Sequence, residues 1–432
     1  MIKFILITQL FLCTIAEAKV YQLKELIAKA VVHPEIQIEQ FEVDKAESLF
    51  ARIDGEMRPK ITILSGLGPN KSSTGNAITS SRSAKVDTVT YLTTVDLKIP
   101  VFMFNRQSDL HKAADGNMKV HELDVQKKQL ELIKKVKEYY YGYQYASSLN
   151  EFATSTLKDL DEALGEMKSS KKTNSEEMGK LQVFRSLAQV KKYEIEKGLA
   201  QGILGLKYIT QDTNPVVEQD WIEYSERKLP TLETLNSQLA ESNIDLRKAK
   251  IGLDAKQAYL TSEKKSLLPI FGIFSSFDYR TTAKSDKQES KFALDPYNRA
   301  DFSVGIGLVW DIDFGVKSSN VSIAQIELET VKVQQAFAQK NLPIKIEKIY
   351  LDLVEAQKKA TELEKTYKTS KKMLNNIASG VALGIAPAKD IIESYTLKAQ
   401  VYQQYVEAIY NYEMRLADLS YEMGKELDPA LN

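Results

Sequence analysis

The clearest pattern in the sequence is a strict alternation of apolar and polar residues near position 300. Over residues 301–314 the odd positions carry only Asp, Ser, Gly and Val, while every even position is apolar. The apolar set is Phe302, Val304, Ile306, Leu308, Trp310, Ile312 and Phe314. A period of two residues is typical of a β-strand with two different faces. The pattern therefore predicts a strand of about 13 residues, longer than the usual five or six.

Three more segments have the same character, at residues 59–68, 85–104 and 269–282. With 301–314 they predict two β-hairpins, 59–104 and 269–314. A loop rich in Ser, Asn, Thr and Gly is expected over 69–84. The segment 269–282 places Phe271, Ile273, Phe277 and Tyr279 on one face. In 85–104 the apolar positions are odd-numbered, in 301–314 even-numbered, and this difference indicates a bulge or a local shift.

The rest of the chain is dominated by long helical patterns. A first helical region is expected over 21–56, with a new helix starting at Pro34, because proline suits the first helical position. The segment 107–167 predicts a helix of roughly 90 Å, and 317–379 predicts a second long one. Return helices are expected to end near 209 and to span 387–425. The last one has a seam with coiled-coil spacing, formed by Tyr395, Ala399, Tyr402, Val406 and Ile409.

The two halves of the sequence repeat one plan at an offset of 210 residues. The same offset relates ordered landmarks over more than 150 residues: Pro59 and Pro269, Phe104 and Phe314, Ala114 and Ala324, Tyr140 and Tyr350. We therefore predict a first repeat at 19–209, a linker at 210–229 and a second repeat at 230–432.

The first eighteen residues read as a secretory signal peptide. Lys3 precedes an apolar run of about a dozen residues, and Ala16-Glu17-Ala18 has the form of a cleavage site. Cys13 lies within the run and follows Leu12, whereas lipidation favours a small preceding residue. Cleavage after Ala18 is therefore expected, and the alternative is a buried N-terminal helix.

The composition excludes several classes of binding partner and chemical site. The chain has 58 basic and 58 acidic residues, so no global charge favours nucleic acid. One Cys and three His, without metal spacing, leave no material for a disulfide framework or a thiolate metal site. The sequence contains no set of residues with the spacing of a known catalytic site, so we expect no enzyme activity, cofactor or metal.

The strands are the feature that points to a membrane. Exported strands with one apolar and one polar face match the wall of a membrane β-barrel. Four strands cannot close a barrel, and an open edge in lipid would leave amides unsatisfied. The chain would then share its barrel with other copies. The alternative is two soluble hairpins packed on helices.

These features resemble the outer-membrane efflux protein (TolC) family over essentially the whole mature chain. The opening pattern Leu26-x3-Ala30-x3-Pro34-x-Ile36 and the run Pro100-Val101-Phe102 before Ala114 are similar to family patterns. The second copy of that run has Trp310 where the family often has Pro. The strongest match is the segment Gly384 to Glu393.

The resemblance implies a TolC-like α+β membrane protein that works as a homotrimer. Its strands would form one 12-stranded barrel in outer-membrane lipid, and its helices a coiled-coil tunnel through the periplasm. It would dock onto a periplasmic adaptor (membrane fusion) protein and an inner-membrane RND or ABC transporter. The function implied is a passive exit duct of a tripartite efflux pump or type I secretion system.

The resemblance also implies two functional sites near the second helix turn. Asp390 and Glu393 match acidic positions that ring the periplasmic constriction in family members; the alternative is that both acids favour the helix dipole and face solvent. An apolar tip would contact the adaptor, although local capping around Gly384 is an alternative. The tip residues are Val381, Leu383, Gly384, Ile385 and Pro387. The Tyr and Arg that help to hold some members closed fall here on Val381 and Ala386, so that lock is absent or built differently.

In this interpretation the lipid-facing barrel residues are Phe271, Ile273, Phe277, Phe302, Val304, Ile306, Leu308 and Trp310. The competing hypothesis for the whole chain is a soluble periplasmic coiled-coil adaptor or scaffold. The sequence leaves the exported substrate open: drugs, metals and proteins are all compatible with it.

Overall fold

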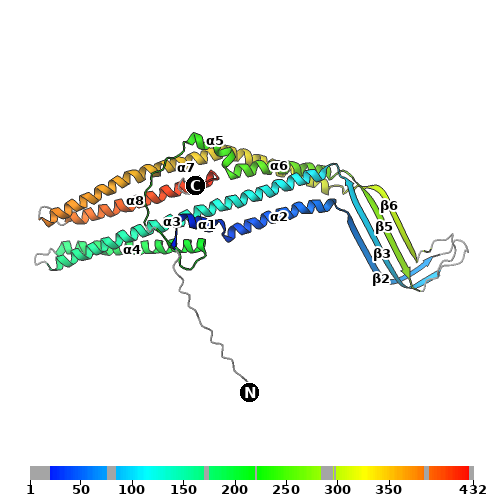
Figure 1. Cartoon of the computed structure of the whole chain (residues 1–432), viewed down its shortest axis with the longest axis horizontal. Coiled ribbons are helices and arrows are strands. Elements are labelled where there is room, and N and C mark those ends of the chain that lie inside the picture. Colours follow the sequence, from blue (N-terminus) through cyan, green and yellow to red (C-terminus); the bar gives the residue numbers. More distant parts are fainter. Residues whose placement is uncertain are drawn as a thin grey trace, which may run out of the picture. The chain divides into compact units, whose positions relative to one another are not determined.

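The structure is a computed structural model that describes residues 20–74, 84–169, 175–218, 221–283, 295, 298–383 and 389–427 (Figure 1). The expected signal peptide, with Cys13, lies outside the described residues. The helices are α1 (Leu23–Val31), α2 (Pro34–Met57), α3 (Arg106–Ser169), α4 (Ser175–Thr210), α5 (Leu232–Ser242), α6 (Ile244–Lys265), α7 (Val316–Ala382) and α8 (Lys389–Glu422). The strands are β1 (Val20–Tyr21), β2 (Lys60–Thr74), β3 (Ala84–Phe102), β4 (Val216–Val217), β5 (Ile270–Thr282) and β6 (Arg299–Val309).

The element order confirms the duplicated plan. Helices α2 and α6 begin 210 residues apart, at Pro34 and Ile244. Strands β2 and β5 begin at Lys60 and Ile270, and α3 and α7 at Arg106 and Val316, with the same offset. The limits of the two repeats, 209 and 230, stay predictions.

Contacts divide the chain into two compact units, and each unit takes segments from both repeats. The first contains residues up to 40, 123–247 and from 337 onward; the second contains 41–122 and 248–336. Neither unit is therefore one repeat, because the long helices run through both units.

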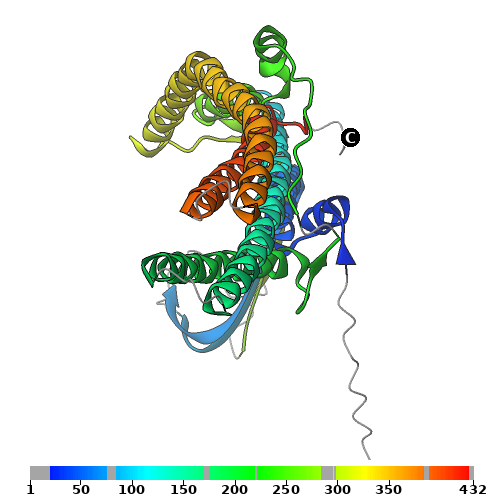
Figure 2. The same ribbon diagram turned by 90° about the vertical axis from the view of Figure 1, so that its left-hand side faces the viewer.

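The first unit is helical, and its core lies between long helices. Leu132 of α3, Leu206 of α4 and Ile409 of α8 are almost fully buried in one cluster. A second cluster joins Leu353 of α7 to Tyr412 of α8. Helix α3 thus packs between α4 and α8, and α8 between α3 and α7 (Figure 2). Strands β1 and β4 form a two-residue parallel pair beside them.

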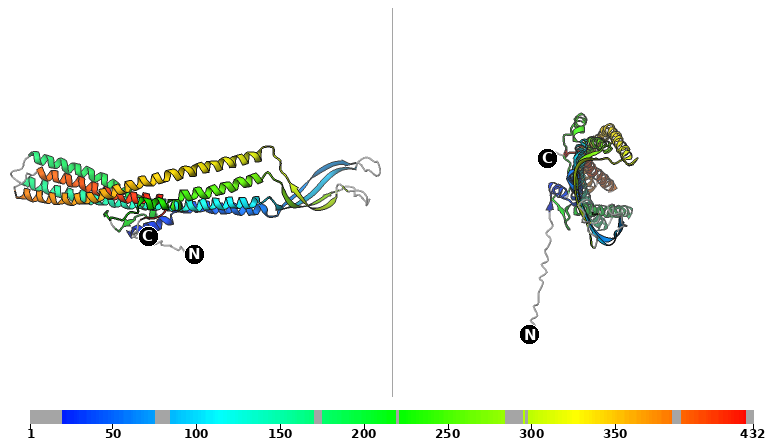
Figure 3. Two further views of the ribbon diagram at one scale, coloured as in Figure 1. Left: turned by 90° about the horizontal axis from the view of Figure 1, so that it is seen from above. Right: turned by 90° about the vertical axis from the view of Figure 1, so that its right-hand side faces the viewer.

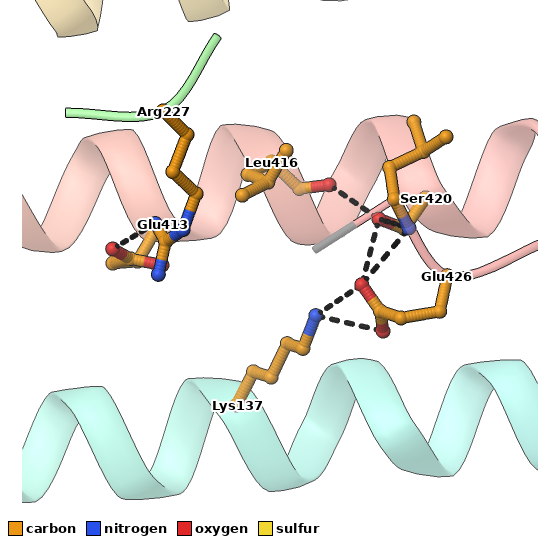
Figure 4. A network of polar contacts seen from close by, with 7 residues as sticks. Lys137, Arg227, Glu413, Leu416, Ser420 and Glu426 are labelled. Carbon is orange, nitrogen blue, oxygen red and sulfur yellow. Dashed lines mark hydrogen bonds and ion pairs between the residues drawn. The ribbon is translucent and has the colours of Figure 1, made fainter. Parts of the chain in front are cut away.

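Two buried ion pairs fix non-helical segments of this unit to its helices (Figure 4). The Lys137 Nζ of α3 lies 2.8 Å from both carboxylate oxygens of Glu426, beyond the end of α8. Glu426 also accepts a hydrogen bond from Ser420 at 3.2 Å. Arg227, in the segment before α5, lies 2.6 Å from Glu413 of α8. Buried charges need such partners, because an unpaired charge away from water is costly.

The second unit contains a four-stranded antiparallel sheet in the order β2-β3-β5-β6, and its strands twist together (Figure 3). Each strand of the sheet is joined to a helix whose adjacent part lies in the same unit: α2 leads into β2, β3 into α3, α6 into β5 and β6 into α7. Helices α3 and α6 approach closely at Gly116, where an added Cβ would lie 2.6 Å from the Cβ of Ala255. The helices α3 and α6 thus lie side by side, as do the strands β3 and β5 to which they are joined.

The strand limits differ from the sequence prediction in two places. Residues 69–74, predicted as loop, continue β2 opposite 84–89 of β3. Their polar composition suggested a turn, but an edge strand tolerates polar residues and even Pro69.

The prediction of a strand over 301–314 was wrong after Val309. The Asp313 carboxylate accepts a hydrogen bond from the Lys317 backbone N–H at 3.1 Å and so caps the start of α7. The alternation of residue types continues past the point where pairing stops.

Candidate functional site

The two faces of the sheet have opposite chemistry. The pairing register places odd-numbered residues of β2, β3 and β5 on one face with even-numbered residues of β6. That face is apolar and largely exposed: Ile306 is 88% and Leu67 74% exposed. Other exposed apolar side chains on it are Ile61, Ile63, Tyr91, Phe271, Phe277, Phe302, Val304 and Leu308. An exposed apolar face of this extent is typical of contact with lipid or with another protein.

A bulge in β3 explains why its apolar positions are odd-numbered, whereas those of β6 are even-numbered. The register between β3 and β5 shifts between Pro100 and Phe102. Before the shift odd residues such as Ile99 share the apolar face, and after it the even residue Phe102 lies opposite Phe271. The extra residue is the local irregularity that the sequence indicated.

The opposite face is polar and joined by side-chain hydrogen bonds. Thr90 and Thr282 lie 2.9 Å apart, and Asn70 donates to Thr90 at 3.2 Å. Thr94 donates to the Asp278 carboxylate at 2.7 Å. Arg280, Arg299 and Asp301 share this face according to the register. A face with these polar and charged side chains is suited to contact with water.

Trp310, predicted to be a barrel residue, lies one position beyond β6. Its indole N–H donates to the Leu267 carbonyl at 3.0 Å, while the ring is 56% exposed. An anchored, half-exposed indole is common where an apolar surface meets a polar one.

The sheet ends in two edges that pair with no other described strand. Strand β2 pairs only with β3, and β6 only with β5, within the part of the chain that the structure describes. These edge strands are 15 and 11 residues long, and alternate residues of each point their backbone groups away from the sheet. Edges of this length require a partner strand or a cover.

The predicted acidic pair lies at the start of α8. Asp390 is half-buried in the first turn, and Glu393 is exposed one turn later. The Asp390 carbonyl accepts a hydrogen bond from the Ser394 hydroxyl at 2.7 Å. Their spacing puts the two carboxylates on one face of the helix.

Only part of the predicted tip can be located. Leu383 follows α7 and is 74% exposed, and Val381 lies in the last turn of that helix. Gly384, Ile385 and Pro387 lie outside the described residues, as does Ala386.

An aromatic cluster joins α3, α7 and α8 inside the first unit. The Tyr402 ring of α8 stacks on Phe152 of α3 at 4.5 Å and contacts Tyr367 of α7 at 4.8 Å. Burial raises the pKa of Tyr402 to about 12. On the same helix, Val406 and Ile409 are buried, so the predicted seam is confirmed as a packing surface.

One contact beside this cluster could not be predicted from the sequence. The Tyr395 hydroxyl donates to the Asp159 carboxylate at 3.1 Å, from α8 to α3. Burial lowers the pKa of the neighbouring Lys398, whose ammonium lies 5.3 Å from the Phe152 ring centre. The residues are more than 230 positions apart, and no local pattern pairs them.

The described residues show no cluster of three or more His, Cys, Asp or Glu side chains that could hold a metal ion. None of the described helices has an apolar stretch long enough to cross a membrane.

Solved structures with the same fold come from several bacteria. MtrE, an outer membrane channel of Neisseria gonorrhoeae solved in its open state, has 14% identity and a TM-score of 0.75; the alignment covers 95% of this chain and 90% of MtrE. VceC, an outer membrane protein of Vibrio cholerae, has 11% identity and a TM-score of 0.76, with 94% and 97% covered. CusC, described in terms of transmembrane channel formation, has 15% identity and a TM-score of 0.76, with 94% and 92% covered.

No curated protein sequence matches the chain. The sequence model of the outer membrane efflux protein family matches residues 30–170 and 235–425, which is one stretch in each repeat and most of the chain. Together with the TolC-like fold and the two-faced sheet, this match shows that the chain belongs to the outer membrane efflux protein family, as a non-enzymatic efflux channel of the outer membrane.

Proposed function

We propose that three copies of this chain close their sheets into one barrel of 12 strands and act as the exit duct of a tripartite efflux pump or a type I secretion system. The observation that carries the proposal is a sheet with an exposed apolar face, a polar face and two edges that are unpaired among the described residues. In lipid every backbone group must be bonded, so such a sheet is stable only in a closed ring. Four strands are too few for a ring, and membrane barrels start at about eight.

In this arrangement the apolar face meets lipid and the polar face lines a water-filled channel. Phe302, Val304, Ile306, Leu308, Phe271, Ile273 and Phe277 would then be in lipid, with Trp310 at the end of the wall. Hydrogen bonds such as Thr94 to Asp278 would lie on the channel side.

The helical unit supplies the periplasmic part of the duct. Three copies of Asp390 and Glu393 would bring six carboxylates to one axis, where they would attract cations and resist anions. The exposed Leu383 and its neighbours at the tip would bind a periplasmic adaptor, and an inner-membrane RND or ABC transporter would supply the energy.

Membrane fractionation combined with gel electrophoresis and planar bilayers tests this function. We expect the protein in the outer-membrane fraction, as a trimer that resists heating in mild detergent, and with stepwise conductance. A soluble periplasmic monomer without conductance would instead support the adaptor or scaffold hypothesis.

A further inference from the structure

Two Gly-x-Gly motifs lie on β2 and β6, the two edge strands of the described sheet. Gly66 and Gly68 belong to β2, and Gly305 and Gly307 belong to β6. The register places all four on the polar face. A Cβ added at Gly66, Gly68 or Gly305 would meet nothing within 4 Å, and at Gly307 only the Phe274 ring at 3.4 Å. Packing within one chain therefore gives no reason for these glycines, although glycine weakens a strand.

The duplicated sheet shows how its two edges can meet. Strands β3 and β5 connect the first repeat to the second; Val95 lies opposite Phe277, and the paired numbers add to 372 over residues 90–99 of β3. In a ring of copies, β6 of one copy meets β2 of the next copy in the equivalent position. The numbers of paired residues should then again add to a constant, which differs from 372 only by a correction for the numbering offset between the repeats.

The correction follows from the two hairpin registers. Ile61 pairs with Leu97 in the first hairpin, and Phe271 pairs with Leu308 in the second. Residues of β5 are thus 210 positions beyond their counterparts in β2, whereas residues of β6 are 211 beyond those in β3. The bulge near Pro100 accounts for the additional residue. The sum of 372 therefore becomes 373 at the junction between copies.

We propose that β6 pairs antiparallel with β2 of the next copy, so that the numbers of opposite residues add to 373. This inference rests on the closed barrel proposed above and specifies its subunit junction. It places Gly305 opposite Gly68 and Gly307 opposite Gly66. The polar-face residues Leu64 and Val309, which are 62% and 47% exposed, become a direct apolar pair. On the apolar face Ile306 lies opposite Leu67.

Neighbouring registers lose these matches. A shift by one residue would set the apolar face of one strand against the polar face of the other. A shift by two keeps only one glycine pair and sets either Leu64 or Val309 opposite a glycine.

Pro69 is compatible with the junction. It lies opposite Val89, whose carbonyl accepts a hydrogen bond from the Ala283 N–H on the β5 side. The backbone of Pro69 therefore faces the outer edge, where its missing N–H removes a single bond of the junction ladder.

Cysteine crosslinking between copies tests the register. The only natural cysteine is Cys13, so a Leu64→Cys and Val309→Cys variant introduces one thiol on each edge. Opposite residues in antiparallel strands have Cα atoms about 4.5–5.5 Å apart, within the range of a disulfide. The matched controls are Leu64→Cys with Gly307→Cys, Gly66→Cys with Val309→Cys, and each single variant.

We expect mild oxidation of the first variant to give a covalent trimer on a denaturing gel, which thiol converts to monomer. The shifted pairs and single variants should lose this band. Crosslinking of a shifted pair, or no crosslink in a protein that still forms conducting trimers, would overturn the register but not the channel. A protein that forms no trimer and no conductance would overturn the barrel itself.

Discussion

Phe104 and Phe314 lie 210 positions apart and have nearly the same left-handed backbone, with φ of 51° and 49°. Each lies between the end of a strand and the start of a long helix, α3 or α7. Left-handed backbone costs a residue with a side chain roughly 1–2 kcal/mol, so it persists where the chain must turn sharply. The two repeats thus turn from sheet to helix at equivalent residues, although the next residue differs, with a φ of 62° at Asn105 and 156° at Gly315.

The surroundings of the two rings predict opposite effects of glycine. The Phe314 ring is 97% exposed, so Phe314→Gly should relieve the strain and leave stability unchanged or raise it by up to about 1 kcal/mol. The Phe104 ring contacts Phe102 at 4.9 Å and Phe271 at 6.2 Å, so Phe104→Gly should cost about 1–3 kcal/mol. Thermal unfolding followed by circular dichroism in detergent compares them, and equal losses would contradict this account of the corner.

The buried pair of Lys137 and Glu426 should be sensitive to removal of either charge. Their side chains are 3% and 16% exposed. Lys137→Met leaves the Glu426 carboxylate without its cation and should cost about 3–5 kcal/mol. Adding Glu426→Leu should recover much of that loss, because an apolar pair can replace a buried ion pair. Unfolding temperature and protease cleavage after α8 are the measurements.

The control for this experiment is an exposed pair on α7. Lys359 and Glu355 lie 2.7 Å apart with side chains more than 60% exposed. Lys359→Met should change stability by less than about 1 kcal/mol. If both lysine variants lose the same stability, burial is not what makes the Lys137 pair important.

Gly424 should tolerate no side chain. It has a φ of 69°, and an added Cβ would lie 2.2 Å from the Ser242 carbonyl oxygen. Gly424→Ala should therefore destabilise the end of α8 by about 2 kcal/mol or more. Gly252→Ala, inside α6 with nothing within 4 Å, should instead stabilise by about 0.5–1 kcal/mol. A neutral Gly424→Ala variant would show that the segment after α8 can move away from Ser242.

The periodic features of the fold could be predicted from the sequence because they repeat. The alternation over 302–308 and the offset of 210 predicted which segments form strands and which of their faces is apolar. They also predicted the limits of the helices to within a few residues. The predicted strand limits were wrong where the composition of a segment suggested one structure and its residues form another. Asp313 fits the polar face of a strand, yet it caps α7. Residues 69–74 resemble a loop in composition, yet they extend an edge strand.

Contacts between distant residues could not be predicted in this way. Lys137 and Glu426 are 289 positions apart, and neither lies in a pattern that identifies the other. The same holds for Tyr395 and Asp159. For the acidic pair, the sequence indicated the positions of Asp390 and Glu393 on a helix start, while their role in the channel stays a prediction.

Neutralising Asp390 and Glu393 tests that role. In the proposed trimer the six carboxylates repel anions and hold cations, so Asp390→Asn with Glu393→Gln should weaken cation block and lower the preference for cations over anions. Planar bilayers with a salt gradient measure both, and the effect should shrink at about 1 M salt, where the Debye length falls to roughly 3 Å. Glu47→Gln, an exposed position on α2, is the matched control and should behave like the parent protein. If the double variant keeps the parent's reversal potential and block, the acids face solvent and serve the helix dipole instead.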